Sequence, residues 1–304
     1  MPEITDFKSP LVGLLRGLHL FHFEGAPCAQ RVRFALAEKG LARGREVPWN
    51  SDAPEARLAA DGTWVSRHVS LIKKQHLTEE YAQIQPNMVV PALVHDGRLY
   101  IESMDIVQYL DETWSQNRLI PADPRAAEHA FALVEQGKQL HVSVRYVSFR
   151  WGLGRLGKLN AKEEASLRAL ERADSPEGLA SFYGGYDANT IAESTYRAHL
   201  EALEHAYDSL DRSLRSDGRA FLTGDSFSIA DILWSLAVLR IHECGYPFRR
   251  NFPALFEWYS RVYQRPGFQR GVLARHKTLS TAFKLKAGVE NLFGVGLARA
   301  SRSA

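Results

Sequence analysis

The stretch that decides the fold runs from His76 to Leu110 and reads HLTEE YAQIQPNMVV PALVHDGRLY IESMDIVQYL. Two short apolar runs lie on either side of Asp96-Gly97, and Asp-Gly between apolar runs is a strong signal for a β-hairpin. The residues that follow, 103–110, repeat apolar side chains at the spacing of a helix. The stretch therefore predicts an antiparallel pair of strands followed by a helix.

The residues before this stretch predict a β-α-β unit. Its elements are a strand at 18–23, a helix at 30–39 that stops at Gly40, and a strand at 45–49. The polar, alanine-rich residues 50–63 are expected to form a loop. A β-α-β unit gives a parallel pair, so with the hairpin we expect a small mixed sheet with helices on its faces.

The second half of the chain changes character. Helical patterns occur at 126–149, 193–214, 229–243 and 253–263, and no comparable strand pattern accompanies them. The linker 120–124 contains two prolines and is a credible domain boundary. We therefore expect an α/β domain at 17–116, an all-α domain at 125–272 and a more basic C-terminal extension at 273–304.

The composition excludes several classes of protein. A net charge of +3 on 304 residues gives no reason to expect a nucleic-acid partner. No apolar run reaches the ~18 residues of a membrane helix, and no apolar signal core opens the chain, so we expect neither membrane insertion nor secretion. Cys28 and Cys244 are too few for a disulfide framework and favour a reducing, cytoplasmic setting. The histidines show no metal-ligand spacing, so no metal is expected.

Two short motifs in the decisive stretch could bind a ligand. Val90-Pro91 is either an ordinary strand start or a cis bond that turns the N–H and C=O of Val90 outward, toward an extended peptide. Ser103 is either the N-cap of its helix or, with the helix N-terminus, the holder of a carboxylate. In the second case Glu102 would pair with an amine, and a ligand with an α-amino and an α-carboxyl group would suit both residues.

Together with Lys74 to Thr78 and Gln85-Pro86, these motifs resemble the glutathione site of glutathione transferases, particularly of the theta class. The resemblance implies a thioredoxin-like domain followed by an all-α domain, glutathione as co-substrate, and a homodimer. It implies that His76 reaches the glycyl carboxylate of glutathione, and that Val90, before cis Pro91, pairs with the cysteinyl backbone. Glu102 and Ser103 would hold the γ-glutamyl end. The segment from Thr223 to Asp231 resembles the capping motif of the family's core helix, with Ser228 and Asp231 at capping-box spacing.

The turn before the first helix departs from the family pattern. The usual serine or cysteine falls at Ala26, which can neither donate a hydrogen bond nor attack. Cys28 lies two residues later, where the helix N-terminus and nearby Arg31 and Arg33 favour a thiolate. The turn is similar to that of the bacterial tetrachlorohydroquinone reductive dehalogenases, in which such a cysteine forms a mixed disulfide with glutathione. Cys28 could instead pack as a small apolar residue, as we expect of Cys244.

The region from His141 to Trp151 is rich in aromatic and arginine residues. By the resemblance it borders the pocket for the second substrate, with Arg145, Tyr146, Phe149 and Arg150 as its candidates; the alternative is an interdomain or dimer contact. We therefore expect a cytoplasmic detoxification enzyme, a glutathione-dependent transferase for a small aromatic or hydrophobic electrophile. Conjugation, reduction, dehalogenation and ether cleavage all remain open. Because of Ala26, the alternative is a non-catalytic glutathione-binding protein on the same fold.

Overall fold

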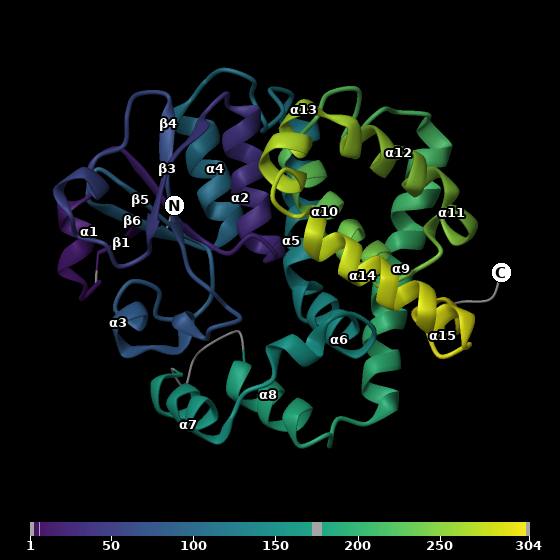
Figure 1. The fold of residues 1–304 in the computed structure, drawn as a ribbon. Coiled ribbons are helices and arrows are strands. Elements are labelled where there is room, and N and C mark those ends of the chain that lie inside the picture. Colours follow the sequence, from purple (N-terminus) through teal and green to yellow (C-terminus); the bar gives the residue numbers. More distant parts are fainter. Residues whose placement is uncertain (1–2, 6, 172–177, 302–304) are drawn as a thin grey trace. The chain divides into compact units, whose positions relative to one another are not determined.

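The computed structural model describes residues 3–5, 7–171 and 178–301, and the chain divides into two compact units. The first unit comprises Met1–Trp114 and Leu156–Thr190, and the second comprises Ser115–Arg155 and Ile191–Ala304. The named strands all lie in the first unit (Figure 1). Residues 156–190 cluster with the strands, although the sequence pattern grouped them with the helical domain.

The first unit is built on a six-stranded mixed sheet with the strand order β1-β6-β5-β2-β4-β3. Strand β4 pairs in parallel with β2 and with β3, whereas the β2–β5, β5–β6 and β1–β6 pairs are antiparallel. The strands are β1 (Glu3–Ile4), β2 (Leu18–His22), β3 (Ala42–Pro48), β4 (Thr63–His68), β5 (Ala92–His95) and β6 (Arg98–Ile101). The expected fold class is confirmed: a thioredoxin-like mixed sheet with helices, followed by a helical domain.

The hairpin forms where Asp96-Gly97 predicts it. Asp96 has φ 50° and Gly97 has φ 79°, so both central residues of the turn lie in the left-handed region that tight hairpins require. The Asp96 carboxylate also accepts a hydrogen bond from the backbone N–H of Gly17 at 2.6 Å, which ties the turn to the start of β2.

The expectation that 18–23 and 45–49 form a neighbouring parallel pair is wrong. Strand β4 lies between β2 and β3 and pairs with both. The sequence of β4, TWVSRH, is too polar to be recognised as a buried strand. The strand is nevertheless buried, because its polar side chains have partners inside the protein. Arg67 is fully buried and donates to the backbone carbonyls of Trp49, Ser51 and Ala56.

Helices α2 (Pro27–Glu38) and α4 (Ser103–Thr113) pack side by side in the first unit (Figure 1). A fully buried ion pair between Lys39 and Asp111 joins their C-terminal ends. The other helices of this unit are α1 (Pro10–Leu14), α3 (Glu79–Ala82), α7 (Ala161–Leu170) and α8 (Leu179–Asp187), with short 3-10 turns at Pro54–Ala56 and Gln75–Leu77. A further 3-10 turn, Gly154–Gly157, contains the point in the chain at which the second unit gives way to the first.

The second unit is helical. Its longer helices are α5 (Pro124–Gln139), α6 (His141–Trp151), α9 (Glu193–Asp217), α10 (Ile229–Glu243), α12 (Pro253–Gln264) and α14 (Lys277–Leu292). Its shorter elements are α11 (Phe248–Asn251), α13 (Pro266–Phe268), a π-helical turn (Gln269–Leu273) and α15 (Leu297–Ala300). The single helix expected at 126–149 is two helices, which meet at Leu140. Among the described residues, no helix combines the length and the hydropathy that a membrane crossing requires.

Helix α10 forms the core of the second unit and begins with the predicted capping box. Ser228 and Asp231 satisfy each other's backbone N–H groups. The Asp231 carboxylate also accepts hydrogen bonds from the indole of Trp258 at 2.7 Å and the N–H of Leu222 at 3.0 Å. This buried carboxylate thus joins three segments of the unit, which explains it as a folding element.

Candidate functional site

The loop before β5 leaves one backbone position without partners. The Val90–Pro91 bond is cis. Buried side chains hold the loop, with Tyr81 Oη donating to the carbonyl of Val89 at 2.9 Å and Gln85 Oε1 accepting from the N–H of Asn87 at 2.8 Å. Within the described residues, the N–H and C=O of Val90 make no hydrogen bond. They can therefore pair with an extended ligand.

Glu102 and Ser103 lie at the junction of β6 and α4. Glu102 has φ 65° and occupies the N-cap position, but its side chain does not cap the helix. Its carboxylate instead accepts from the amide of Asn87 at 3.4 Å. Ser103 is the first residue of α4, so the interpretation of Ser103 as the N-cap is wrong. No side chain caps α4, and its first N–H groups remain suited to an anion.

His76 lies in the 3-10 turn Gln75–Leu77 and is buried, with 6% of its surface exposed. Burial, and secondarily the charge of Lys74, lowers the pKa of His76 to about 3. The ring is therefore neutral at physiological pH. Its Nδ1 has no hydrogen-bond partner among the residues that the structure describes, which leaves one polar atom of a buried side chain unsatisfied there.

The segment around His76 is covered by the helices α7 and α8. Leu77 and Met88 share an apolar cluster with Leu167 and Leu179 of these helices. Ser166 Oγ donates to the carbonyl of Leu77 at 2.9 Å, and Lys74 Nζ donates to that of Gly157 at 2.7 Å. These contacts from Gly157, α7 and α8 therefore fix the position of the His76 turn.

The turn before α2 brings Cys28 to the helix N-terminus. Ala26 is the N-cap, with no side chain to cap the helix, and its methyl group packs against the core of the first unit. Cys28, in the first turn, is half-buried. The guanidinium of Arg31 donates through Nη1 to Cys28 Sγ at 3.6 Å and to Ser103 Oγ at 3.3 Å. Through Arg31 the structure thus connects two candidate residues that lie far apart in the sequence.

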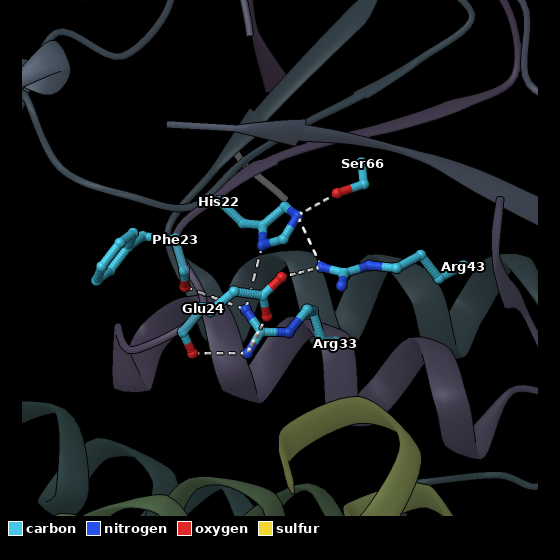
Figure 2. Close-up of polar contacts among 6 residues, drawn as sticks. All are labelled: His22, Phe23, Glu24, Arg33, Arg43 and Ser66. Atoms are coloured by element: carbon cyan, nitrogen blue, oxygen red, sulfur yellow. Dashed lines mark hydrogen bonds and ion pairs between the residues drawn. The ribbon is translucent and has the colours of Figure 1, made fainter. Parts of the chain in front are cut away.

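A buried polar network holds the backbone that leads into this turn (Figure 2). Arg33 donates to the carbonyl oxygens of Phe23 at 3.1 Å and Glu24 at 2.9 Å. Its Nη1 also lies 3.2 Å from Nδ1 of His22. The Glu24 carboxylate forms ion pairs with both Arg33 and Arg43. Arg33 of α2 therefore fixes the backbone of residues 23–24.

The ring of His22 is oriented by this network. Both ring nitrogens face guanidinium groups, with Nδ1 at 3.2 Å from Arg33 and Nε2 at 3.2 Å from Arg43. Nε2 also lies 2.8 Å from Ser66 Oγ, and Arg43 pairs with Glu24 as well. The sequence predicts for Arg33 only that its positive charge lies near Cys28. The signal for its structural role is the presence of two arginines on the buried face of one helix.

The four candidate residues of the electrophile pocket lie on α6 in the second unit. Tyr146 packs against the ring of His199, with centroids 4.1 Å apart, and against Tyr196. Arg150 is exposed and forms an ion pair with Glu193 at 3.0 Å. Arg145 and Phe149 are half-buried. The four thus share one helix, but a surface pocket of about 470 Å³ in this unit is lined by other residues, from Arg249 to Gln264.

Among the described residues, no three or more His, Cys, Asp and Glu side chains form a group that could hold a metal ion.

Comparison with known protein families gives two matches. Residues 20–118 match the model of the glutathione S-transferase N-terminal domain, and residues 175–266 match that of the glutathione S-transferase C-terminal domain. The two matches fall in the order that a complete two-domain member of the family would show.

Curated relatives match most of the chain. A 2,5-dichlorohydroquinone reductive dechlorinase of Sphingobium indicum is 28% identical, over 84% of this chain and 82% of the relative. A tetrachloro-p-hydroquinone reductive dehalogenase of Sphingobium chlorophenolicum is 27% identical, over 82% of this chain and 93% of the relative.

Solved structures share the fold. The β-etherase LigF from Sphingobium sp. strain SYK-6 aligns with a TM-score of 0.67 at 19% identity, covering 84% of this chain and 99% of LigF. Human glutathione transferase theta-2 aligns with a TM-score of 0.63 at 17% identity, covering 94% of this chain and 99% of the human protein. At these identities the likeness concerns the fold alone.

Proposed function

The chain belongs to the glutathione S-transferase superfamily, and from that premise we propose that it is an enzyme that uses glutathione against a small aromatic electrophile. The observation that carries the glutathione half is the backbone of Val90, which lacks partners among the described residues just before β5. Such a backbone position suits an extended peptide, here the cysteinyl part of glutathione. The names of the two dehalogenating relatives support an aromatic halide as the electrophile.

The other ends of glutathione have proposed partners in the same unit. Glu102 pairs with the γ-glutamyl amine, because its carboxylate lies at the start of α4 beside Ser103 and is not used to cap the helix. Ser103 and the uncapped start of α4 take the γ-glutamyl carboxylate. His76, neutral and with an unsatisfied Nδ1, hydrogen bonds to the glycyl carboxylate without contributing charge.

The proposed chemistry has two forms. In conjugation, the glutathione thiolate forms a C–S bond with the electrophilic carbon and the leaving group departs with its electron pair. In reduction, the Cys28 thiolate then attacks the sulfur of the adduct, the C–S bond breaks, and the aromatic carbon takes a proton. The resulting mixed disulfide between Cys28 and glutathione is cleaved by a second glutathione, which leaves as the oxidised dimer.

The second unit supplies the electrophile pocket in this proposal. Tyr146 and Phe149 offer aromatic surface, and Arg145 and Arg150 offer positive charge for a phenolate or another anionic substituent. We further propose a cytoplasmic homodimer without a metal cofactor, because these properties accompany the family.

A non-catalytic glutathione-binding protein is the second candidate. Ala26 favours it, since the residue that usually activates the thiol is missing from the N-cap of α2. Glutathione would then bind with the same contacts and no electrophile would react.

One experiment separates these candidates. The purified chain is titrated with glutathione by calorimetry and then assayed with glutathione and chlorinated hydroquinones, aryl halides, aryl ethers and disulfides, with products identified by mass spectrometry. Binding with turnover of an aromatic substrate supports the enzyme. Binding without any turnover supports the second candidate, and the absence of binding overturns both.

A further inference from the structure

Helix α14, yellow in Figure 1, and the turn after it carry an unusual share of the exposed apolar side chains. Ten large hydrophobic residues are exposed in the described part of the chain, and five of them fall within residues 285–295. Exposed apolar residues that occur singly are ordinary on a protein surface, whereas a group of them marks a surface that contacts something apolar. The five residues, called the outer stripe below, are Leu285, Val289, Leu292, Phe293 and Val295.

The outer stripe is continuous along the helix. Leu285, Val289 and Leu292 follow one another at intervals of four and three residues, so they line one side of α14. Phe293 and Val295 extend the stripe beyond the C-terminal end of the helix. Leu292 is 82% exposed and Phe293 is 74% exposed, so the described residues leave this end of the stripe almost uncovered.

The opposite side of α14 is attached to the second unit. Phe283 and Ala287 are buried on that side, and the guanidinium of Arg240 lies over the ring of Phe283 at 4.7 Å. His276, directly before the helix, is held by the buried carboxylate of Glu243, with Nε2 2.8 Å from Oε1. These contacts fix which side of α14 faces outward.

The charges beside the outer stripe are nearly all positive. Residues 277–304 contain five basic residues and one acidic residue, Glu290, so their net charge of +4 exceeds the +3 of the whole chain. Glu290 is already paired with Lys286 at 2.6 Å. Lys277 and Lys284 are exposed, form no ion pair with a described residue, and lie two helical turns apart on one flank of the stripe.

An apolar stripe bordered by lysines matches the boundary between the headgroups and the acyl chains of an anionic membrane. The apolar side chains would enter the acyl layer, and the lysines would reach the headgroups, because their alkyl stems can lie along apolar surface. A second copy of this chain is a poorer match. Two such faces in contact would bring their lysines together, and α14 has no unpaired acidic residue to meet them.

We propose that the outer stripe and its flanking lysines bind the surface of an anionic lipid bilayer, with α14 lying along that surface. This inference goes beyond the proposed function and does not depend on glutathione. It gives the basic C-terminal extension a binding role that neither family match covers, since the second match ends at residue 266.

The test measures binding of the full chain to lipid vesicles by co-sedimentation. Vesicles of phosphatidylcholine with phosphatidylglycerol should bind the wild type about tenfold or more tightly than vesicles of phosphatidylcholine alone. Added salt should weaken this binding, because it screens exposed charges. Leu292→Ser together with Phe293→Ser should lower the affinity for the anionic vesicles about tenfold or more, because the buried apolar area is lost. Lys277→Gln together with Lys284→Gln should lower it as well and should reduce its salt dependence.

Leu58→Ser is the matched control, because Leu58 is an exposed leucine of the first unit, and this variant should bind as the wild type does. Thermal unfolding should show that all variants stay folded, since each replaced side chain is exposed. A wild type that binds anionic vesicles no better than neutral ones, or a Leu292→Ser, Phe293→Ser variant that binds as tightly as the wild type, overturns the proposal. If the wild type binds no vesicles and that variant loses a dimer in light scattering, the face is an interface between copies, which overturns the proposal as well.

Discussion

The guanidinium of Arg31 lies 3.6 Å from the sulfur of Cys28, one helical turn away on α2. A positive charge at this distance stabilises the thiolate, so Arg31→Gln should slow alkylation of Cys28 by iodoacetamide at neutral pH. The measurement is the rate of modification of the Cys28 peptide, followed by mass spectrometry across pH.

Two controls accompany this experiment. Cys244 should stay unmodified in the folded protein, because burial raises the pKa of its thiol to about 12. Lys162→Gln, which removes an exposed charge from α7, should leave the Cys28 rate as it is. An unaltered rate in Arg31→Gln would mean that Arg31 does not stabilise the thiolate.

Cys28→Ala should change which product forms. If the enzyme reduces its substrate, the dehalogenated product should fall by about 10²-fold or more, the scale on which loss of a positioned reactive group acts. The glutathionyl adduct should accumulate instead, because the step that forms it does not need Cys28. Products are separated by liquid chromatography, with Cys244→Ala as the matched control. Unchanged product ratios and turnover would remove Cys28 from the mechanism.

The buried ring of His76 makes the protein sensitive to acid. Its folded-state pKa of about 3 lies below the ordinary 6.5, so the unfolded chain takes up the proton first as the pH falls. Its contribution to the free energy of unfolding is constant above pH 6.5. As the pH falls from 6.5 to about 3, the contribution of His76 to the free energy of unfolding decreases by up to about 1.4 kcal/mol per pH unit.

Urea denaturation at pH 7.5 and at pH 5 measures this loss. His76→Gln should lose less stability between the two pH values than the wild type does. His205→Gln, at an exposed position of α9, should behave as the wild type. Equal pH dependence in all three proteins would show that His76 titrates normally in the folded state.

The ion pair between Lys39 and Asp111 should matter for stability and not for chemistry. Both side chains are fully buried, so Asp111→Asn removes the carboxylate that pairs with a buried cation and should cost about 3–5 kcal/mol in the free energy of unfolding. Replacing both residues, as in Lys39→Met with Asp111→Leu, should recover most of that loss. The exposed pair of Lys138 and Glu135 is the control, and Glu135→Gln should cost less than about 1 kcal/mol. Chemical denaturation reports all of these values, and a small loss in Asp111→Asn would contradict the account.

The parts of the fold that local chemistry determines could be predicted from the sequence. The hairpin follows from Asp96-Gly97, whose positive φ values the turn requires, and the helix after it follows from apolar spacing. Strand β4 could not be predicted in this way, because Arg67 makes the segment look exposed. That arginine is buried because carbonyl oxygens of the connection between β3 and β4 bind it.

The same division applies to the candidate site. Val90, Glu102 and Ser103 form a linear motif, and a motif can be read along the chain. The contact of Arg31 with Ser103 joins two residues 72 positions apart, and no spacing rule connects the two. Its neighbour Arg33 looks the same in the sequence, but it forms an ion pair with Glu24 and donates hydrogen bonds to two backbone carbonyls.

The connection from β3 to β4 looks like a suitable site for inserting a reporter domain or for creating new chain termini. It is long, polar and mostly irregular, as tolerant insertion sites usually are. Arg67 makes it a poor choice, because this one side chain binds three of its carbonyl oxygens from inside the sheet. Cutting there would remove the backbone carbonyls that hold a guanidinium in the core.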